Sequence, residues 1–179
     1  KVEDNISNEF IFQLFFFLRA KCEKPIIAAI HGYCFGAGID LSSCCDIRYC
    51  SRDTKFSIKY IIFTEFLENV RTLFVSLGSH IGLAADVGTL QILPKFITNH
   101  SLFRELVFTS RTFDANEAQE IGLISRTFDT REALLDATLS LASLIASKSP
   151  IGVQGSKINL TYARDHNVTI ILHLSYAID

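Results

Sequence analysis

A short glycine-containing turn is the segment of this sequence best suited to chemistry. The apolar run 26–30 is followed, after five intervening residues, by Gly36-Ala37-Gly38, and the residues after the turn predict a helix over 39–45. Backbone amides at a helix N-terminus point outward with the positive end of the helix dipole behind them, and small side chains let a ligand approach closely. This geometry can bind a developing oxyanion. Tight packing of the strand against the helix explains the same glycines about equally well.

The elements that must position this turn alternate between apolar strands and helices. Pro25 opens the continuous apolar run 26–30, which predicts a strand buried on both faces. Further strands are predicted over 47–50, 55–58 and 123–128. The alternation of strands and helices predicts an α/β architecture.

The second half of the chain is predicted to be mostly helical. Asp114 should cap a helix over 115–120, and Glu117 stands where a capping box requires it. Asp129 should cap a long amphipathic helix that runs to Ser147. The apolar face of that helix would consist of Leu134, Leu135, Leu139, Leu141, Leu144 and Ile145.

Composition excludes several classes of function. The chain has 179 residues, 49% of them apolar and 20% charged, with a net charge of −2 and no basic run, so nucleic-acid binding is not expected. Its apolar stretches are too short to span a membrane. The five cysteines are odd in number and form no CxxC pair, which indicates free thiols rather than disulfides or a metal site. Because the sequence contains no methionine, we expect the natural start to lie upstream.

The segment 25–48 makes the sequence recognisable. It resembles the signature of the crotonase (enoyl-CoA hydratase/isomerase) superfamily, in which a buried Pro-x-Ile-Ala-Ala strand leads to a small-residue turn, an acid, Leu and then Cys-Asp-Ile-Arg. Within the superfamily it is most similar to the Δ3,5-Δ2,4-dienoyl-CoA isomerases. The stretches that carry this narrower resemblance are 46–50, 82–91, 93–95, 147–150 and 159–166.

The resemblance implies a crotonase-like α/β fold, a spiral of ββα units with a helical C-terminal trimerisation region. Residues 1–128 would form part of the spiral core, with an insertion at about 60–81 that has no family counterpart, and 129–179 would form the C-terminal helical region. The resemblance also implies that both ends of the domain are missing. The front part would supply the loop that grips CoA and a second oxyanion amide.

The resemblance further assigns roles to five residues. The amide of Ala37 would be one of two that bind the thioester carbonyl oxygen, and Gly36 and Gly38 would flank it as substrate-binding residues. Asp40 would line the acyl pocket, and Asp86 would be one half of a two-acid proton relay, so that Ala37, Asp40 and Asp86 form the catalytic set. Moving a 3,5-diene into 2,4-conjugation removes one proton and returns another, which suits two carboxyl groups of different pKa. No metal or redox cofactor is implied, since CoA is part of the substrate.

The sequence departs from the family where the second relay acid is expected. Tyr60 follows Lys59 at that position, and 22 residues separate Lys59 from Gly82 where relatives have only a few. The inserted stretch contains Glu65 and Glu68, but neither has the register of the missing acid. A tyrosine with an ordinary pKa of about 10 cannot replace a carboxylate as a base near neutral pH.

Three functions therefore stay open at the level of sequence. The first is a dienoyl-CoA isomerase of fatty-acid β-oxidation, impaired by the lost acid. The second is an enoyl-CoA hydratase, against which Asp86 argues because hydratases usually have glycine there. The third is a non-catalytic crotonase-fold module that binds acyl-CoA or assembles with other subunits. The resemblance implies a homotrimer or hexamer in mitochondria or peroxisomes.

Overall fold

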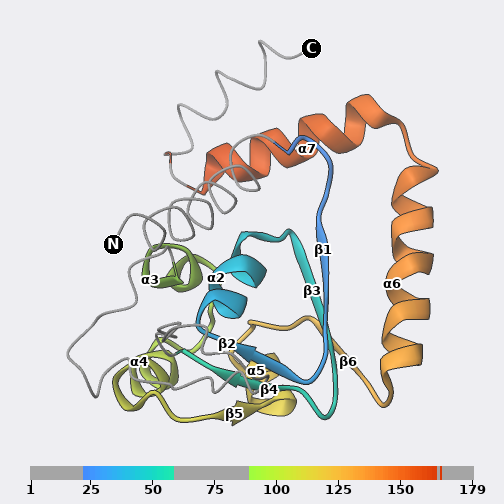
Figure 1. The fold of residues 1–179 in the computed structure, drawn as a ribbon. Helices are drawn as coiled ribbons and strands as arrows, with labels where there is room; N and C mark the ends of the chain where they lie inside the picture. The colour runs from blue at the N-terminus through green and yellow to red at the C-terminus, as the bar shows by residue number, and fades with distance from the viewer. Residues whose placement is uncertain (1–21, 59–88, 165, 167–179) are drawn as a thin grey trace, which may run out of the picture.

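The computed structural model describes residues 22–58, 89–164 and 166 of the chain (Figure 1). The first described part contains β1 (Ile27–Ile30), β2 (Tyr33–Phe35), α2 (Ala37–Cys44), β3 (Ile47–Ser51) and β4 (Lys55–Ser57). The second contains α3 (Thr89–Ile92), the 3-10 helix η2 (Leu93–Lys95), α4 (His100–Thr109), β5 (Phe113–Asp114), α5 (Ala115–Glu120), β6 (Arg126–Phe128), α6 (Arg131–Ala146) and α7 (Pro150–Ala163).

The strands form two sheets, and successive strands along the chain are added to both of them. One sheet has the order β1-β3-β6 with all strands parallel, and the other has the order β2-β4-β5, in which β5 runs antiparallel to β4. The pair β1 and β2 is followed by the pair β3 and β4, and each new pair adds one strand to each sheet. This stepwise growth confirms the predicted α/β spiral of ββα units.

Helices α2 and α6 lie on opposite sides of the β1-β3-β6 sheet (Figure 1). Helix α2 contacts β2 and α3, whereas α6 packs on all three strands of the sheet. The rings of Phe56 and Phe113 stack with centroids 5.5 Å apart and join β4 to β5 in the interior. Side chains that are almost fully buried fill the core around them, including Ile39, Leu93, Leu106, Ile121, Leu123 and Ile124.

Two strand predictions need correction. All four residues of β1 are half-buried, so this strand is not buried on both faces within the described part of the chain. The strand predicted over 123–128 begins only at Arg126. The amides of Leu123 and Ile124 donate to the carbonyl oxygen of Ala118, at 2.9 and 3.1 Å, and so complete the end of α5 instead of pairing in the sheet.

The predicted helix caps are confirmed at one helix and wrong at another. Asp114 caps α5, because its carboxylate accepts a hydrogen bond from the Glu117 amide at 3.0 Å. The reciprocal half of a capping box is absent, since the Glu117 carboxylate binds Arg111. Helix α6 is capped by the Thr130 hydroxyl, which accepts from the Ala133 amide at 3.1 Å. Asp129 instead forms an exposed ion pair with Arg52.

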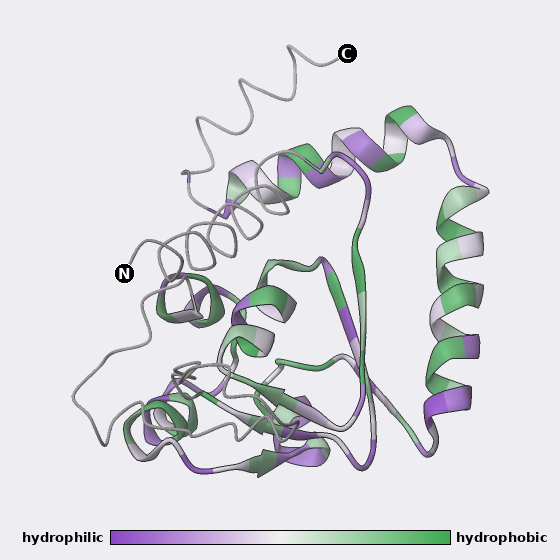
Figure 2. Ribbon diagram, viewed as in Figure 1, coloured by the Kyte–Doolittle hydropathy of each residue, from purple (hydrophilic) through white to green (hydrophobic). Residues whose placement is uncertain are grey.

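The last two helices expose much of their apolar surface. Of the predicted apolar face of α6 only Leu134 is buried, and Leu139 is 64% exposed. Helix α7 buries no residue fully, and Leu160 is 73% exposed. Figure 2 shows the corresponding hydrophobic bands along both helices. None of the helices in the described ranges is long and apolar enough to cross a membrane.

Candidate active site

The glycine turn forms the start of α2, which begins at Ala37, two residues before the helix predicted over 39–45. Gly36 adopts φ 48° and ψ −112°, a conformation that favours glycine, and it immediately precedes Ala37, the first residue of the helix. The Gly36 amide donates to the Ser57 carbonyl oxygen at 3.1 Å, and the Gly36 carbonyl oxygen accepts from the amides of Ile39 (2.8 Å) and Asp40 (3.1 Å). The turn is therefore held to strand β4 on one side and to its own helix on the other.

The amides of Ala37 and Gly38 have no acceptor among the residues that the structure describes. Both residues are half-buried, and their amides belong to the first turn of α2, where the positive end of the helix dipole lies. The structure thus places Ala37, the predicted oxyanion donor, between Gly36 and Gly38 with a donor available for an anionic oxygen. The catalytic role of this amide stays a prediction.

Gly38 also lies in contact with strand β2, in line with the packing interpretation of the glycine turn. A Cβ atom on Gly38 would lie 3.4 Å from the Cys34 Sγ atom of strand β2. Cys34 is buried, and burial raises the pKa of its thiol to about 12. A thiol that stays protonated is a packing group rather than a nucleophile. All five cysteines are free, as predicted.

Asp40 lies in the first turn of α2 and is only 7% exposed. Its Oδ1 atom accepts two hydrogen bonds from Thr89, one from the backbone amide at 3.1 Å and one from the side-chain hydroxyl. Thr89 is the first residue of α3, so this contact ties the starts of the two helices together. The sequence analysis missed Thr89, because the sequence gives no sign of a partner 49 residues away from Asp40.

The remaining predicted site residues lie outside the described part of the chain. These are Asp86, the predicted relay acid, and the insertion at about 60–81 with Tyr60, Glu65 and Glu68. Of the segment that carries the isomerase resemblance around Asp86, the structure describes Thr89, Leu90 and Gln91. The relay assignment of Asp86 therefore stays a prediction.

The Cys-Asp-Ile-Arg signature supports the far end of α2. The Arg48 guanidinium donates to the carbonyl oxygens of Leu123 (2.7 Å) and Cys45 (2.6 Å) and lies over the Phe96 ring, 4.4 Å from its centroid. Asp46 accepts from the Ile26 amide at 2.7 Å. These residues hold α2 against its neighbouring strands and are scaffold rather than chemistry.

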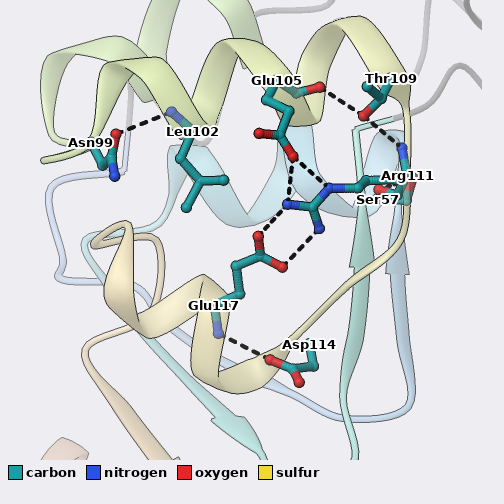
Figure 3. A network of polar contacts seen from close by, with 8 residues as sticks. All are labelled: Ser57, Asn99, Leu102, Glu105, Thr109, Arg111, Asp114 and Glu117. Atoms are coloured by element: carbon teal, nitrogen blue, oxygen red, sulfur yellow. Dashed lines mark hydrogen bonds and ion pairs between the residues drawn. The ribbon is translucent and has the colours of Figure 1, made fainter.

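A polar network joins α4, α5 and the turn after α4 close to Ser57 of strand β4 (Figure 3). The Ser57 hydroxyl, which is fully buried, donates to the Ser110 carbonyl oxygen at 3.0 Å. Arg111, the next residue, binds Glu105 of α4 at 3.0 Å and Glu117 of α5 at 2.9 Å. The hydrogen bonds to Glu117 contribute most to raising the pKa of Arg111 above its ordinary value. Ion pairs thus hold the turn after α4, and Ser57 connects this turn to Gly36 through its hydroxyl and its carbonyl oxygen.

Comparison with known proteins identifies the family. The model for the enoyl-CoA hydratase/isomerase family matches residues 3–66 and 67–174. The chain belongs to the enoyl-CoA hydratase/isomerase family. The match supports the resemblance inferred from residues 25–48 and accounts for the paired growth of the two sheets.

The curated proteins similar to this chain include two isomerases. The mitochondrial Δ(3,5)-Δ(2,4)-dienoyl-CoA isomerase of Rattus norvegicus is 50% identical over 157 residues, which cover 88% of this chain and 42% of the rat protein. The peroxisomal isomerase of the same name from Arabidopsis thaliana is 39% identical over 148 residues, covering 83% of this chain and 46% of the plant protein. The chain thus spans less than half the length of these curated relatives.

A solved structure agrees in fold. The enoyl-CoA hydratase of Bacillus anthracis superposes with a TM-score of 0.81 at 22% identity, covering 99% of this chain and 61% of that one. At that identity the likeness shows the fold alone. The crotonase-like fold predicted from the sequence is therefore confirmed.

Proposed function

We propose that the protein to which this chain belongs is an isomerase that converts 3,5-dienoyl-CoA to 2,4-dienoyl-CoA in fatty-acid β-oxidation. The observation that carries the proposal is the 50% identity to the rat isomerase over 157 residues. The arrangement of Ala37 and Gly38 supports it, because two amides at the start of α2 have no acceptor among the described residues.

The amide of Ala37 is proposed to stabilise the charge that develops on the thioester oxygen. Removal of a proton next to the thioester leaves an enolate conjugated with both double bonds, and return of a proton at the far end of the conjugated system completes the shift of both double bonds. Amide donors directed at the developing oxyanion lower the barrier more than they stabilise the substrate. The reaction moves protons and transfers no electrons to an acceptor, so the proposal includes no metal or redox cofactor beyond the CoA of the substrate.

Asp86 is proposed to be the carboxylate that moves one of these protons, on the strength of its match to the isomerase pattern. The residue at the position of the second acid is Tyr60, whose phenol is a poor base near neutral pH. We therefore propose that the chain with this sequence is an impaired isomerase, because one positioned acid or base contributes roughly 10²–10⁴-fold to a rate.

The proposal extends to assembly and location. A homotrimer or hexamer would cover the apolar surface that α6 and α7 expose, of which Leu139 and Leu160 are examples. The relatives named above are a mitochondrial and a peroxisomal enzyme, and we propose one of these two compartments for this protein.

The test is an assay of the protein expressed from its complete gene. Isomerisation of 3,5-dienoyl-CoA is followed by the absorbance of the 2,4-diene, and hydration of 2-enoyl-CoA is measured in parallel. Slow isomerisation that exceeds hydration supports the proposal. Faster hydration would favour an enoyl-CoA hydratase, and acyl-CoA binding without either reaction would favour a non-catalytic binding module.

A further inference from the structure

The contact between Asp40 and Thr89 bears on whether the amides of the glycine turn stay free to bind the thioester oxygen. Both residues are buried, with 7% and 1% of their surfaces exposed. The amide and the hydroxyl of Thr89 donate to the same carboxylate oxygen, Oδ1 of Asp40. A carboxylate oxygen has two lone-pair directions, and Thr89 offers one donor for each of them.

The direction of this contact is unusual for an acid in the first turn of a helix. Such a carboxylate is normally stabilised by the free amides and the positive dipole end of its own helix. In α2 the amides of Ala37 and Gly38 have no acceptor among the described residues, yet the described partner of Asp40 Oδ1 is Thr89 of another helix. Loss of that partner would remove both described hydrogen bonds to Oδ1 and so lower the cost of turning the Asp40 carboxylate toward these amides.

A carboxylate that turned toward the amides would compete with the substrate. It would occupy donors that the thioester oxygen needs, and it would place one negative charge beside another in a buried setting, where repulsion is strong. The competition would be most costly in the enolate and in the transition states that flank it, because negative charge develops on the thioester oxygen only there.

We propose that Thr89 is a positioning residue for the isomerisation. Its two donors hold the Asp40 carboxylate toward α3 and keep the α2 amides free for the oxyanion. This inference rests on the proposed function. Thr89 acts through Asp40 and does not itself touch the reacting atoms.

The proposal is tested with three variants of the protein expressed from its complete gene. Thr89→Val removes the hydroxyl while keeping the amide and the shape of the side chain, and Thr89→Ser keeps the hydroxyl. Thr138→Val is the matched control, because the Thr138 hydroxyl donates only within its own helix, to the Leu134 carbonyl oxygen at 2.7 Å. We expect Thr89→Val to lower kcat by about 10- to 100-fold with little change in KM, as for other losses of positioning. Thr89→Ser and Thr138→Val should stay near wild type.

A second measurement separates this inference from the proposed function. Thermal unfolding of Asp40→Asn, Thr89→Val and the double variant forms a double-mutant cycle. We expect the loss in Tm of the double variant to be clearly smaller than the sum of the two single losses. Additive losses would overturn the pairing, and a Thr89→Val variant with wild-type kcat would overturn the positioning role. Coupled Tm values in a protein that isomerises nothing would overturn the proposed function and leave Thr89 only a packing contact.

Discussion

The amide of Gly36 donates to the carbonyl oxygen of Ser57, at 3.1 Å, and this hydrogen bond fastens the candidate oxyanion turn to strand β4. The side chain of Ser57 points its hydroxyl to the Ser110 carbonyl oxygen, so one residue joins the turn before α2 to the turn after α4. Ser110 has a positive φ of 51°, a conformation that costs energy for a residue other than glycine. The Arg111 ion pairs and the Ser57 hydroxyl together hold it there.

Replacing Ser57 with Ala should destabilise the protein measurably. The substitution leaves the buried Ser110 carbonyl oxygen without its strongest described donor, which typically costs about 1–3 kcal/mol. The Tm measured by circular dichroism should fall by several degrees. Ser156→Ala is the matched control, since that exposed hydroxyl bonds only within α7, and its Tm should hardly change. Equal Tm values for the two variants would show that the Ser57 link contributes nothing.

Replacing Ala37 with Pro should remove the candidate oxyanion donor with little damage to the fold. Ala37 is the first residue of α2, a position at which proline is well tolerated because the amide has no partner within the helix. Turnover should fall about 10²–10³-fold, as for loss of other oxyanion donors. Arg131→Pro, at the exposed first position of α6, is the control and should keep full turnover. A folded Ala37→Pro variant with normal turnover would contradict the oxyanion assignment.

The sequence predicted local backbone elements better than it predicted the partners of individual side chains. Strand β1, the helix after the turn and the strands β3 and β4 follow from apolar patterning and glycine placement, which act within a few residues. Strand β2, directly before the turn, was not predicted. The cap of α6 did not follow, because Asp129 and Thr130 are adjacent and both are good capping residues; Thr130 is the cap, and Asp129 forms an exposed ion pair with Arg52. Propensity alone does not choose between two such neighbours.

The candidate site was predictable only as far as its backbone. The amide of Ala37 belongs to a local turn, so its exposure follows from Gly36 and Gly38. The partners of Asp40 and Ser57 lie 49 and 53 residues away and depend on how the chain returns to the sheet. Nothing in the sequence around Thr89 or Ser110 indicates that they bind Asp40 and Ser57, and these contacts become visible only in the folded structure.

The exposed faces of α6 and α7 should drive assembly. Leu139 and Leu160 are 64% and 73% exposed, and the protein expressed from its complete gene should run as a trimer or hexamer in light scattering. Introducing a charge by Leu139→Glu should shift the population toward smaller species, because burying an unpaired carboxylate in an interface is costly. Glu132→Gln in the first turn of the same helix is an exposed control. A wild-type protein that stays monomeric at micromolar concentration would contradict the prediction.

The segment between Lys59 and Gly82 should limit the rate of isomerisation. The family resemblance implies a second relay acid at the position of Tyr60, so replacing residues 60–81 with a short linker that begins with Glu should restore the pair of carboxyl groups with Asp86. The rate of 2,4-diene formation should rise by roughly 10²–10⁴-fold, the usual contribution of one positioned acid or base. A linker of the same length that begins with Gln is the matched control and should give no such rise.

Asp86→Asn in the shortened, Glu-containing form should abolish this gain. An amide neither accepts nor releases a proton near neutral pH, so only one group of the relay would remain. If this variant keeps the activity of its parent, Asp86 is structural and the isomerase mechanism loses its main residue. If the protein with residues 60–81 intact already isomerises 3,5-dienoyl-CoA as fast as the shortened form, another group supplies the second acid. Glu65→Gln and Glu68→Gln would then identify it, because the variant that removes the working acid should lose the activity that the other retains.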